Sequence, residues 1–115
     1  MKLPDALLAL SALGHETRLS AFRLLVRAGH AGMAVGDLRG RLDIPSATLT
    51  AHLNILRAAK LVTNEREGRV IRIRADYTQM NSLLGYLTEN CCMDDATSCA
   101  PGSACKPAKN RSEKK

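Results

Sequence analysis

The chain has 115 residues and a formal net charge of +6, a size that suits one domain with a tail. Hydrophobic residues make up 45% of it and aromatic residues only 3%, so the core must be aliphatic. The apolar run at residues 1–14 is interrupted by Asp5, is too short to span a membrane and has the wrong flanks for a signal peptide. We therefore expect a cytoplasmic protein with no membrane partner, whose positive charge is compatible with nucleic acid.

The first half of the chain is predicted to form four helices. The first carries leucines at helical spacing and stops near Gly14, and the second runs from His15 to Gly29. A short third helix spans residues 35–42. After the turn at residues 43–46 a fourth helix begins, where Pro45 suits the first turn and Ser46 can act as the cap. Two short helices joined by a tight turn are typical of a helix-turn-helix.

A β-hairpin and a last helix follow. Residues 70–75 alternate between apolar and arginine side chains, which predicts a half-buried strand paired with residues 62–64 across a charged tip at Glu67 and Gly68. Asp76 and Tyr77 open the last helix, whose apolar stripe is suited to a partner subunit: Met80, Leu83, Leu84 and Leu87.

The predicted fold class is mainly α with a β-hairpin wing, a winged helix-turn-helix. Residues 1–92 would form the DNA-binding and dimerisation domain. Residues 93–115 would form a flexible tail that carries Cys99 and Cys105. The composition of this tail predicts that it is basic and disordered after about residue 106.

Candidate DNA-binding residues lie on the fourth helix and the hairpin. The start of the recognition helix would enter the major groove, with short polar side chains near bases or phosphates: Ser46, Thr48 and Thr50. Phosphate contacts are predicted for His52, Arg57, Arg66 and Arg69. The alternatives are that the short polar residues are ordinary surface groups and that His52 is packed or solvated. Arg72 and Arg74 fit either a phosphate contact or a solvated strand face.

Four cysteines fall within the fifteen residues 91–105, and there are none elsewhere: Cys91, Cys92, Cys99 and Cys105. In a reducing cytoplasm such a cluster favours metal or redox chemistry over disulfides. Three thiols suit a soft trivalent ion such as As(III). The rival interpretations are a tetrahedral zinc site using all four cysteines, a redox or persulfide switch, and a pair with no function.

Three segments in family order resemble the ArsR/SmtB family of arsenic- and metal-responsive repressors: ALGHETRLSAFRLL, IPSATLTAHLNILRAAKLV and EREGRVIRIRA. The resemblance covers about residues 5–92 and implies a homodimer that leaves its operator DNA when an inducer binds. It also implies that the protein dimerises through its first and last helices. Two inducer sites common in the family are missing here. One of them uses cysteines on the helix before the recognition helix, where AVGDLRG has none. The other uses carboxylates and histidines along the last helix, where DYTQMNSLLGYLTEN has no histidine and only two carboxylates. This argues against a zinc sensor of the last-helix type.

The segment YLTENCC followed by a further cysteine resembles the branch of arsenic repressors with its As(III) site at the end of the last helix. This resemblance implies Cys91, Cys92 and Cys99 as ligands, with Cys105 as an alternate. The inducer would be As(III), or Sb(III) or a trivalent organoarsenical, and no resident cofactor is required. One alternative is a thiol-redox, persulfide or zinc/cadmium-responsive repressor of the same fold.

A protein of another class, an arsenic-handling thiol enzyme or metal carrier, is the remaining alternative. The chain has no phosphate-cradling loop and no histidine beside the cysteines, so we predict that it is not an enzyme.

Overall fold

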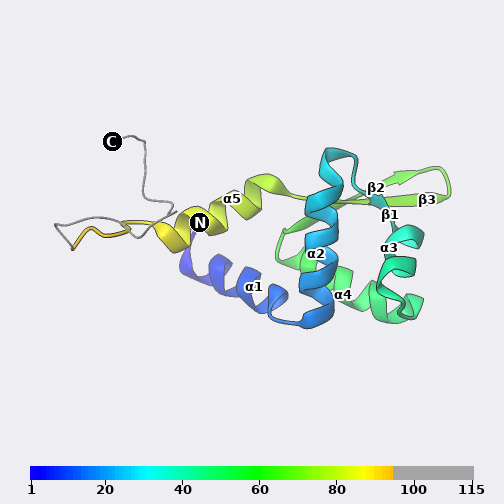
Figure 1. The fold of residues 1–115 in the computed structure, drawn as a ribbon, viewed down its shortest axis with the longest axis horizontal. Helices are drawn as coiled ribbons and strands as arrows, with labels where there is room; N and C mark the ends of the chain where they lie inside the picture. Colours follow the sequence, from blue (N-terminus) through cyan, green and yellow to red (C-terminus); the bar gives the residue numbers. More distant parts are fainter. Residues whose placement is uncertain (95–115) are drawn as a thin grey trace. The chain divides into compact units, whose positions relative to one another are not determined.

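The computed structural model describes residues 1–94. In order along the chain, its elements are α1 (Leu3–Leu13), α2 (Glu16–Ala28), the 3-10 turn η1 (Gly29–Ala31), β1 (Met33–Ala34), α3 (Val35–Leu42), α4 (Ser46–Ala58), β2 (Val62–Glu67), β3 (Val70–Ala75) and α5 (Tyr77–Thr88) (Figure 1). This is the predicted winged helix-turn-helix. No helix in residues 1–94 is long and apolar enough to cross a membrane. The described residues divide into two compact units, Met1–Leu83 and residues 84–94.

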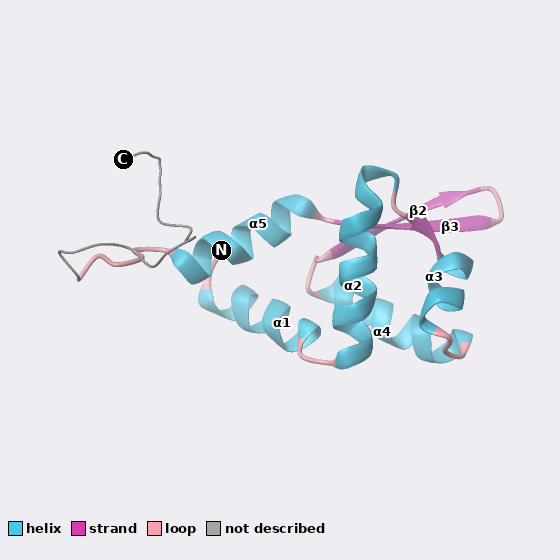
Figure 2. Cartoon of the chain, in the orientation of Figure 1, coloured by secondary structure: helices cyan, strands magenta, loops and turns pink. Residues whose placement is uncertain are grey.

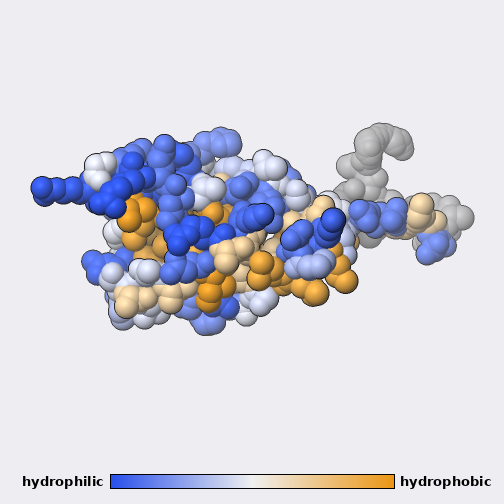
Figure 3. All heavy atoms as spheres, turned by 180° about the vertical axis from the view of Figure 1, so that it is seen from behind, coloured by the Kyte–Doolittle hydropathy of each residue, from blue (hydrophilic) through white to orange (hydrophobic). Residues whose placement is uncertain are grey.

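The first helix packs inward through alanines rather than through its leucines. Its three buried residues are Ala6, Ala9 and Ala12. The leucines that mark it as a helix in the sequence lie on its outer face, with Leu3 56%, Leu7 57% and Leu10 41% exposed. Figure 3 shows hydrophobic residues at the surface of the molecule on the face that it draws. An apolar face of this kind, left open to water, is suited to a partner surface.

The helix-turn-helix consists of α3 and α4. Between them Asp43 adopts a left-handed conformation with φ of 53°, which turns the chain sharply. The inner face of α4 is buried as predicted, through Leu49, Leu53 and Leu56. The prediction that Ser46 caps α4 is wrong. Pro45 occupies the cap position with extended backbone, and Ser46 is already the first helical residue.

The wing is a hairpin of β2 and β3 in antiparallel register, closed by Gly68 and Arg69 (Figure 2). Ile73 and Ala75 are buried, whereas Ile71 lies closer to the tip and is exposed. The sheet has a third strand, β1, which pairs with the outer edge of β3 and gives the order β1-β3-β2. This two-residue strand was not predicted from the sequence.

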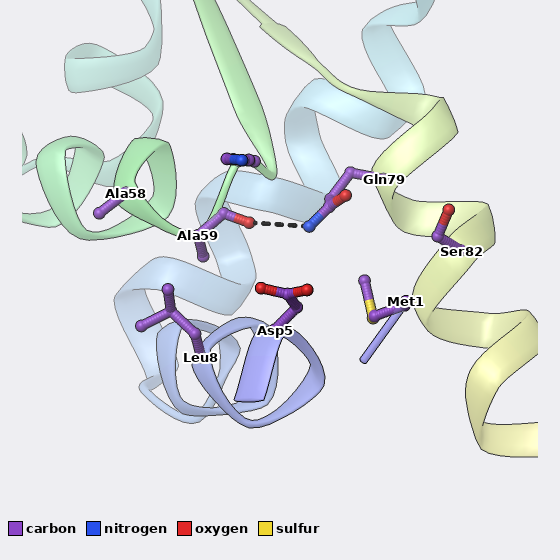
Figure 4. Close-up of a pocket in the computed structure, with 8 residues that line it drawn as sticks. Met1, Asp5, Leu8, Ala58, Ala59, Gln79 and Ser82 are labelled. Carbon is purple, nitrogen blue, oxygen red and sulfur yellow. Dashed lines mark hydrogen bonds between the residues drawn. The ribbon is translucent and has the colours of Figure 1, made fainter. Parts of the chain in front are cut away.

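The start of α5 is fixed by three hydrogen bonds within the first unit. The Asp76 carboxylate accepts from the backbone N–H of Gln79 at 3.0 Å and caps the helix. The Tyr77 hydroxyl donates to the Val26 carbonyl at 3.0 Å, and the Gln79 amide donates to the Ala59 carbonyl at 3.1 Å (Figure 4). The Gln79 amide borders a cavity of about 250 Å³ that is also lined by Asp5. The beginning of α5 is therefore tied to α2 and to the end of α4.

Candidate functional site

The outer face of α4 carries the predicted base-reading residues. Ser46, Thr48 and Thr50 are all exposed, whereas Leu49, Leu53 and Leu56 of the same helix are buried. No side chain caps the first turn of α4, so its backbone N–H groups remain available to an anion such as a DNA phosphate. The arrangement is that of a recognition helix, and the individual contacts to bases stay a prediction.

His52 is partly buried and lies against residues from α2 and its cap. Its Nδ1 is 3.3 Å from a guanidinium nitrogen of Arg18, and its ring centroid is 4.7 Å from that of His15. Arg18 also donates to the Ala12 carbonyl at 2.6 Å, at the end of α1. Since a guanidinium can only donate, Nδ1 of His52 is an acceptor and carries no proton. His52 thus has a packing role that links α4 to the first two helices, and its predicted phosphate contact stays a prediction.

This environment predicts an acid-sensitive fold. Burial, then the nearby His15 and Arg18, lower the pKa of His52 below its ordinary value. Between that lowered pKa and about 6.5 the unfolded chain binds more protons than the folded one, so the free energy of unfolding falls as the pH drops through this window. We expect urea denaturation at pH 7.5 and 5.5 to show a smaller loss of stability for His52→Gln than for the wild-type protein.

His30 supplies the control for this measurement. Its ring packs edge-on against Tyr77 at 4.9 Å, away from Arg18. His30→Gln leaves the contacts of His52 intact and is compared with His52→Gln at both pH values. An equal loss of stability in wild type and His52→Gln would contradict the assignment.

The arginines of α4 and the wing divide into two groups. Arg72 donates to the Ala31 carbonyl at 3.1 Å and pairs with Glu67 at 3.3 Å, and Arg74 forms an ion pair with Glu65. These contacts place both arginines within the internal contacts of the sheet and its preceding turn, and a phosphate contact for either of them stays a prediction. The other three arginines that are predicted to contact DNA phosphates are all exposed. Of these Arg57 donates to Asn54, Arg66 donates to the Gly68 carbonyl at 3.2 Å, and Arg69 lies in the turn of the hairpin.

The cysteine pair lies in the second unit, just after α5 ends at Thr88. The backbone N–H of Cys91 donates to the Thr88 carbonyl at 2.9 Å, and Asn90 and Cys92 both have φ of 61°. This tight turn places the two sulfurs 3.4 Å apart. Two sulfurs bound to one metal atom at about 2.3 Å each can be at most about 4.6 Å apart. The observed spacing therefore allows both sulfurs to bind the same metal atom.

The hydrogen bond between the two sulfurs raises the pKa of the Cys91 thiol, with smaller contributions from desolvation and from the charge of Cys92. The proton of the Cys91 thiol is therefore held more tightly than that of an isolated cysteine. Cys99 and Cys105 lie outside the described residues. Within residues 1–94 no three side chains of His, Cys, Asp or Glu are grouped so that they could hold a metal ion.

Comparison with known proteins identifies the family. A helix-turn-helix domain family matches residues 13–65. An ArsR-like transcriptional regulator from Rhodococcus sp. RHA1 is 31% identical over 73% of this chain and 76% of its own, with a TM-score of 0.64. The chain belongs to the ArsR family of transcriptional regulators.

Two further solved structures resemble this ArsR-family chain. NolR from Sinorhizobium fredii is 32% identical over 75% of this chain and 83% of its own, with a TM-score of 0.59. A homodimeric winged helix-turn-helix domain, Mb0332 from Mycobacterium bovis, shares the fold at 23% identity, with a TM-score of 0.61 over 76% of this chain and 82% of its own. No curated protein matches the chain. The DNA-binding fold and the role in transcription regulation are thus established, and the inducer is a separate question.

Proposed function

We propose that this ArsR-family regulator is a repressor that releases its operator DNA when As(III) binds Cys91, Cys92 and Cys99, with Cys105 as an alternate third ligand. The observation that carries the proposal is the 3.4 Å separation of the Cys91 and Cys92 sulfurs, which suits two ligands of one soft atom. The seven residues from Cys92 to Cys99 can span up to about 23 Å, so the chain is long enough to return a third sulfur to the pair.

The raised pKa of the Cys91 thiol favours arsenous acid over a divalent cation. When As(OH)3 meets a thiol, an As–S bond replaces an As–O bond, and the thiol proton leaves with the hydroxide as water. Three thiols give three water molecules and no net proton. Zn²⁺ or Cd²⁺ must instead release the thiol protons to solvent, which becomes costly where the pKa of a thiol is raised, as it is for Cys91.

We also propose that the regulator is a cytoplasmic homodimer formed through its first and last helices. The outward leucines of α1 support a partner at this face, and Leu84 and Leu87 of α5 are also exposed, at 52% and 53%. The similar domain Mb0332 is itself homodimeric. In this arrangement residues 1–92 bind DNA and dimerise, and residues 93–115 supply the third sulfur. Inducer bound next to the end of α5 would act on the dimer and so on the two recognition helices.

An ion panel tests the proposal. Reduced protein is bound to a fluorescent duplex selected by the protein from a random library, and arsenite, antimonite, zinc and cadmium are added in parallel while anisotropy is recorded. Proton release is followed with a pH indicator in weak buffer. We expect arsenite and antimonite to release the duplex. We also expect close to zero protons to be released to solvent for each ion bound.

The other outcomes identify the alternatives. Release by zinc or cadmium, accompanied by protons, would replace the trivalent inducer with a divalent one. Release by a mild oxidant or a persulfide donor, with no response to arsenite, would make the cysteines a redox switch. Turnover of an arsenic compound without DNA binding would assign the chain to a thiol enzyme.

A further inference from the structure

Three arginines outside the recognition helix and the wing line one concave surface. Arg23 and Arg27 are one turn apart on the same side of α2, and Arg41 lies in the last turn of α3. Together with Ser20, Leu24 and Leu42 they line a cavity of about 390 Å³ where α2 packs against α3. The sequence does not reveal this cluster, because only the packing of α2 on α3 brings residues from the two helices together.

The charges of this cluster are not neutralised within the described part of the chain. Both ion pairs found in residues 1–94 belong to the wing, and the residues that line the cavity include no carboxylate. Two arginines four residues apart on one helix repel each other, so Arg23 and Arg27 weaken α2 as an isolated helix. Arg41 complements the negative end of the α3 dipole, but this effect does not explain the two arginines of α2.

We infer that this cavity, the α2–α3 arginine cleft, binds a phosphate group, and that the group belongs to the DNA backbone flanking the bases read by α4. Guanidinium groups form paired hydrogen bonds to phosphate oxygens, and the Ser20 hydroxyl supplies a further donor. Leu24 and Leu42 line the cavity beside the charged groups. A single phosphate held by several arginines is the ligand that this chemistry fits.

The position of the cleft favours DNA as the source of the phosphate. In a helix-turn-helix complex the first helix of the motif crosses the DNA backbone while the second enters the major groove. Here α3 is that first helix, and Arg41 lies five residues before Ser46, the start of α4. A free phosphorylated molecule has the same chemistry and is the alternative source. The inference rests on DNA binding by the family fold and does not depend on the inducer.

The salt dependence of DNA binding tests the cleft. Binding of the full-length protein to a fluorescent 30-base-pair duplex of arbitrary sequence is measured from low to physiological salt, because binding of this kind is almost wholly electrostatic. The slope of log K against log salt falls by about 0.9 for each phosphate that the protein no longer neutralises. Because each cleft holds one phosphate, we expect a fall of about 0.9 for each bound protomer in Arg23→Ala/Arg27→Ala/Arg41→Ala.

Two controls separate a cleft from bulk charge. Lys2→Ala removes a cation at the start of α1, away from the cleft, and should leave the slope unchanged. Replacing the three arginines by lysine keeps the charge and should retain most of the slope. Thermal unfolding checks that the alanine variant still folds, as expected for side chains that are exposed.

Pyrophosphate, titrated at constant ionic strength and followed by ³¹P NMR, distinguishes the two sources of phosphate. A reduced slope in the folded alanine variant supports the DNA backbone assignment. Pyrophosphate binding that needs the arginines, with an unchanged DNA slope, would overturn that assignment in favour of a small phosphorylated ligand. An unchanged slope in the alanine variant, together with no pyrophosphate binding, would overturn the phosphate site altogether. Failure of the wild-type protein to bind any duplex would instead count against DNA binding itself.

Discussion

The Cys91→Ser and Cys92→Ser variants are each expected to bind operator DNA as tightly as the wild-type protein and to stay bound when arsenite is added. Coupling between an inducer and DNA amounts to about 1–3 kcal/mol in typical cases, or about 5- to 150-fold in affinity. We expect arsenite to weaken wild-type binding within that range and to leave the affinity of either variant within about twofold. Fluorescence anisotropy with and without arsenite measures both quantities.

The physical reason lies in the geometry of the turn after α5. Cys91 and Cys92 present two sulfurs to one point, 3.4 Å apart, and a serine hydroxyl is a harder donor that does not replace a thiol for a soft ion. Both cysteines follow Thr88, beyond α5 and far along the chain from the residues proposed to touch DNA, so the loss should be confined to the inducer response.

Two tail variants complete this experiment. Cys99→Ser should behave like the two variants of the pair, whereas Cys105→Ser should retain arsenite release if Cys99 is the third ligand. If Cys105→Ser abolishes arsenite release and Cys99→Ser retains it, Cys105 is the third ligand and the site at the vicinal pair still stands. Wild-type release by both Cys91→Ser and Cys92→Ser would contradict the assignment of the inducer site to the vicinal pair.

The elements with a strong local pattern could be predicted from the sequence. The inward leucines of α4 and the alternation along β3 depend on residues within a few positions of one another. So does the start of the second helix near His15, whose ring accepts from the Thr17 N–H at 3.1 Å. The helix-turn-helix and its wing follow from these local signals. The adjacent cysteines belong to the same class, because two neighbours on one turn cannot lie far apart.

The features that were missed depend on contacts between distant segments. Strand β1 has two residues, too few to show an alternation, and it exists because Met33 and Ala34 pair with Ile73 and Arg72. On α1 the leucines gave the helical period, but small alanines allow close packing and so form the inner face. The partners of His52 lie 34 and 37 positions earlier, in Arg18 and His15, and no local pattern shows them.

The Gly32→Ala variant is expected to lose about 2–5 kcal/mol of unfolding free energy, measured by urea denaturation. Gly32 has φ of 68°, a conformation that costs residues with a side chain about 1–2 kcal/mol. A Cβ at this position would also overlap the carbonyl oxygen of Ile73 and crowd the Cγ of Arg74. Forcing extra atoms into such a place costs about 1–3 kcal/mol more. Because the next residue, Met33, pairs with Ile73, the substitution directly disturbs the pairing of β1 with β3.

Two other glycines separate these two costs. Gly29 has φ of 80°, but a Cβ added there would meet no atom within 4 Å, so Gly29→Ala should show the backbone cost alone, about 1–2 kcal/mol. Gly40 lies inside α3 with open space around it, and Gly40→Ala should stabilise the protein by about 0.5–1 kcal/mol. If Gly32→Ala loses no more stability than Gly29→Ala, the predicted collision of a Cβ at residue 32 with β3 does not add to the cost of the substitution. A larger loss that also weakens DNA binding would show that the wing needs β1 to hold its place beside the recognition helix.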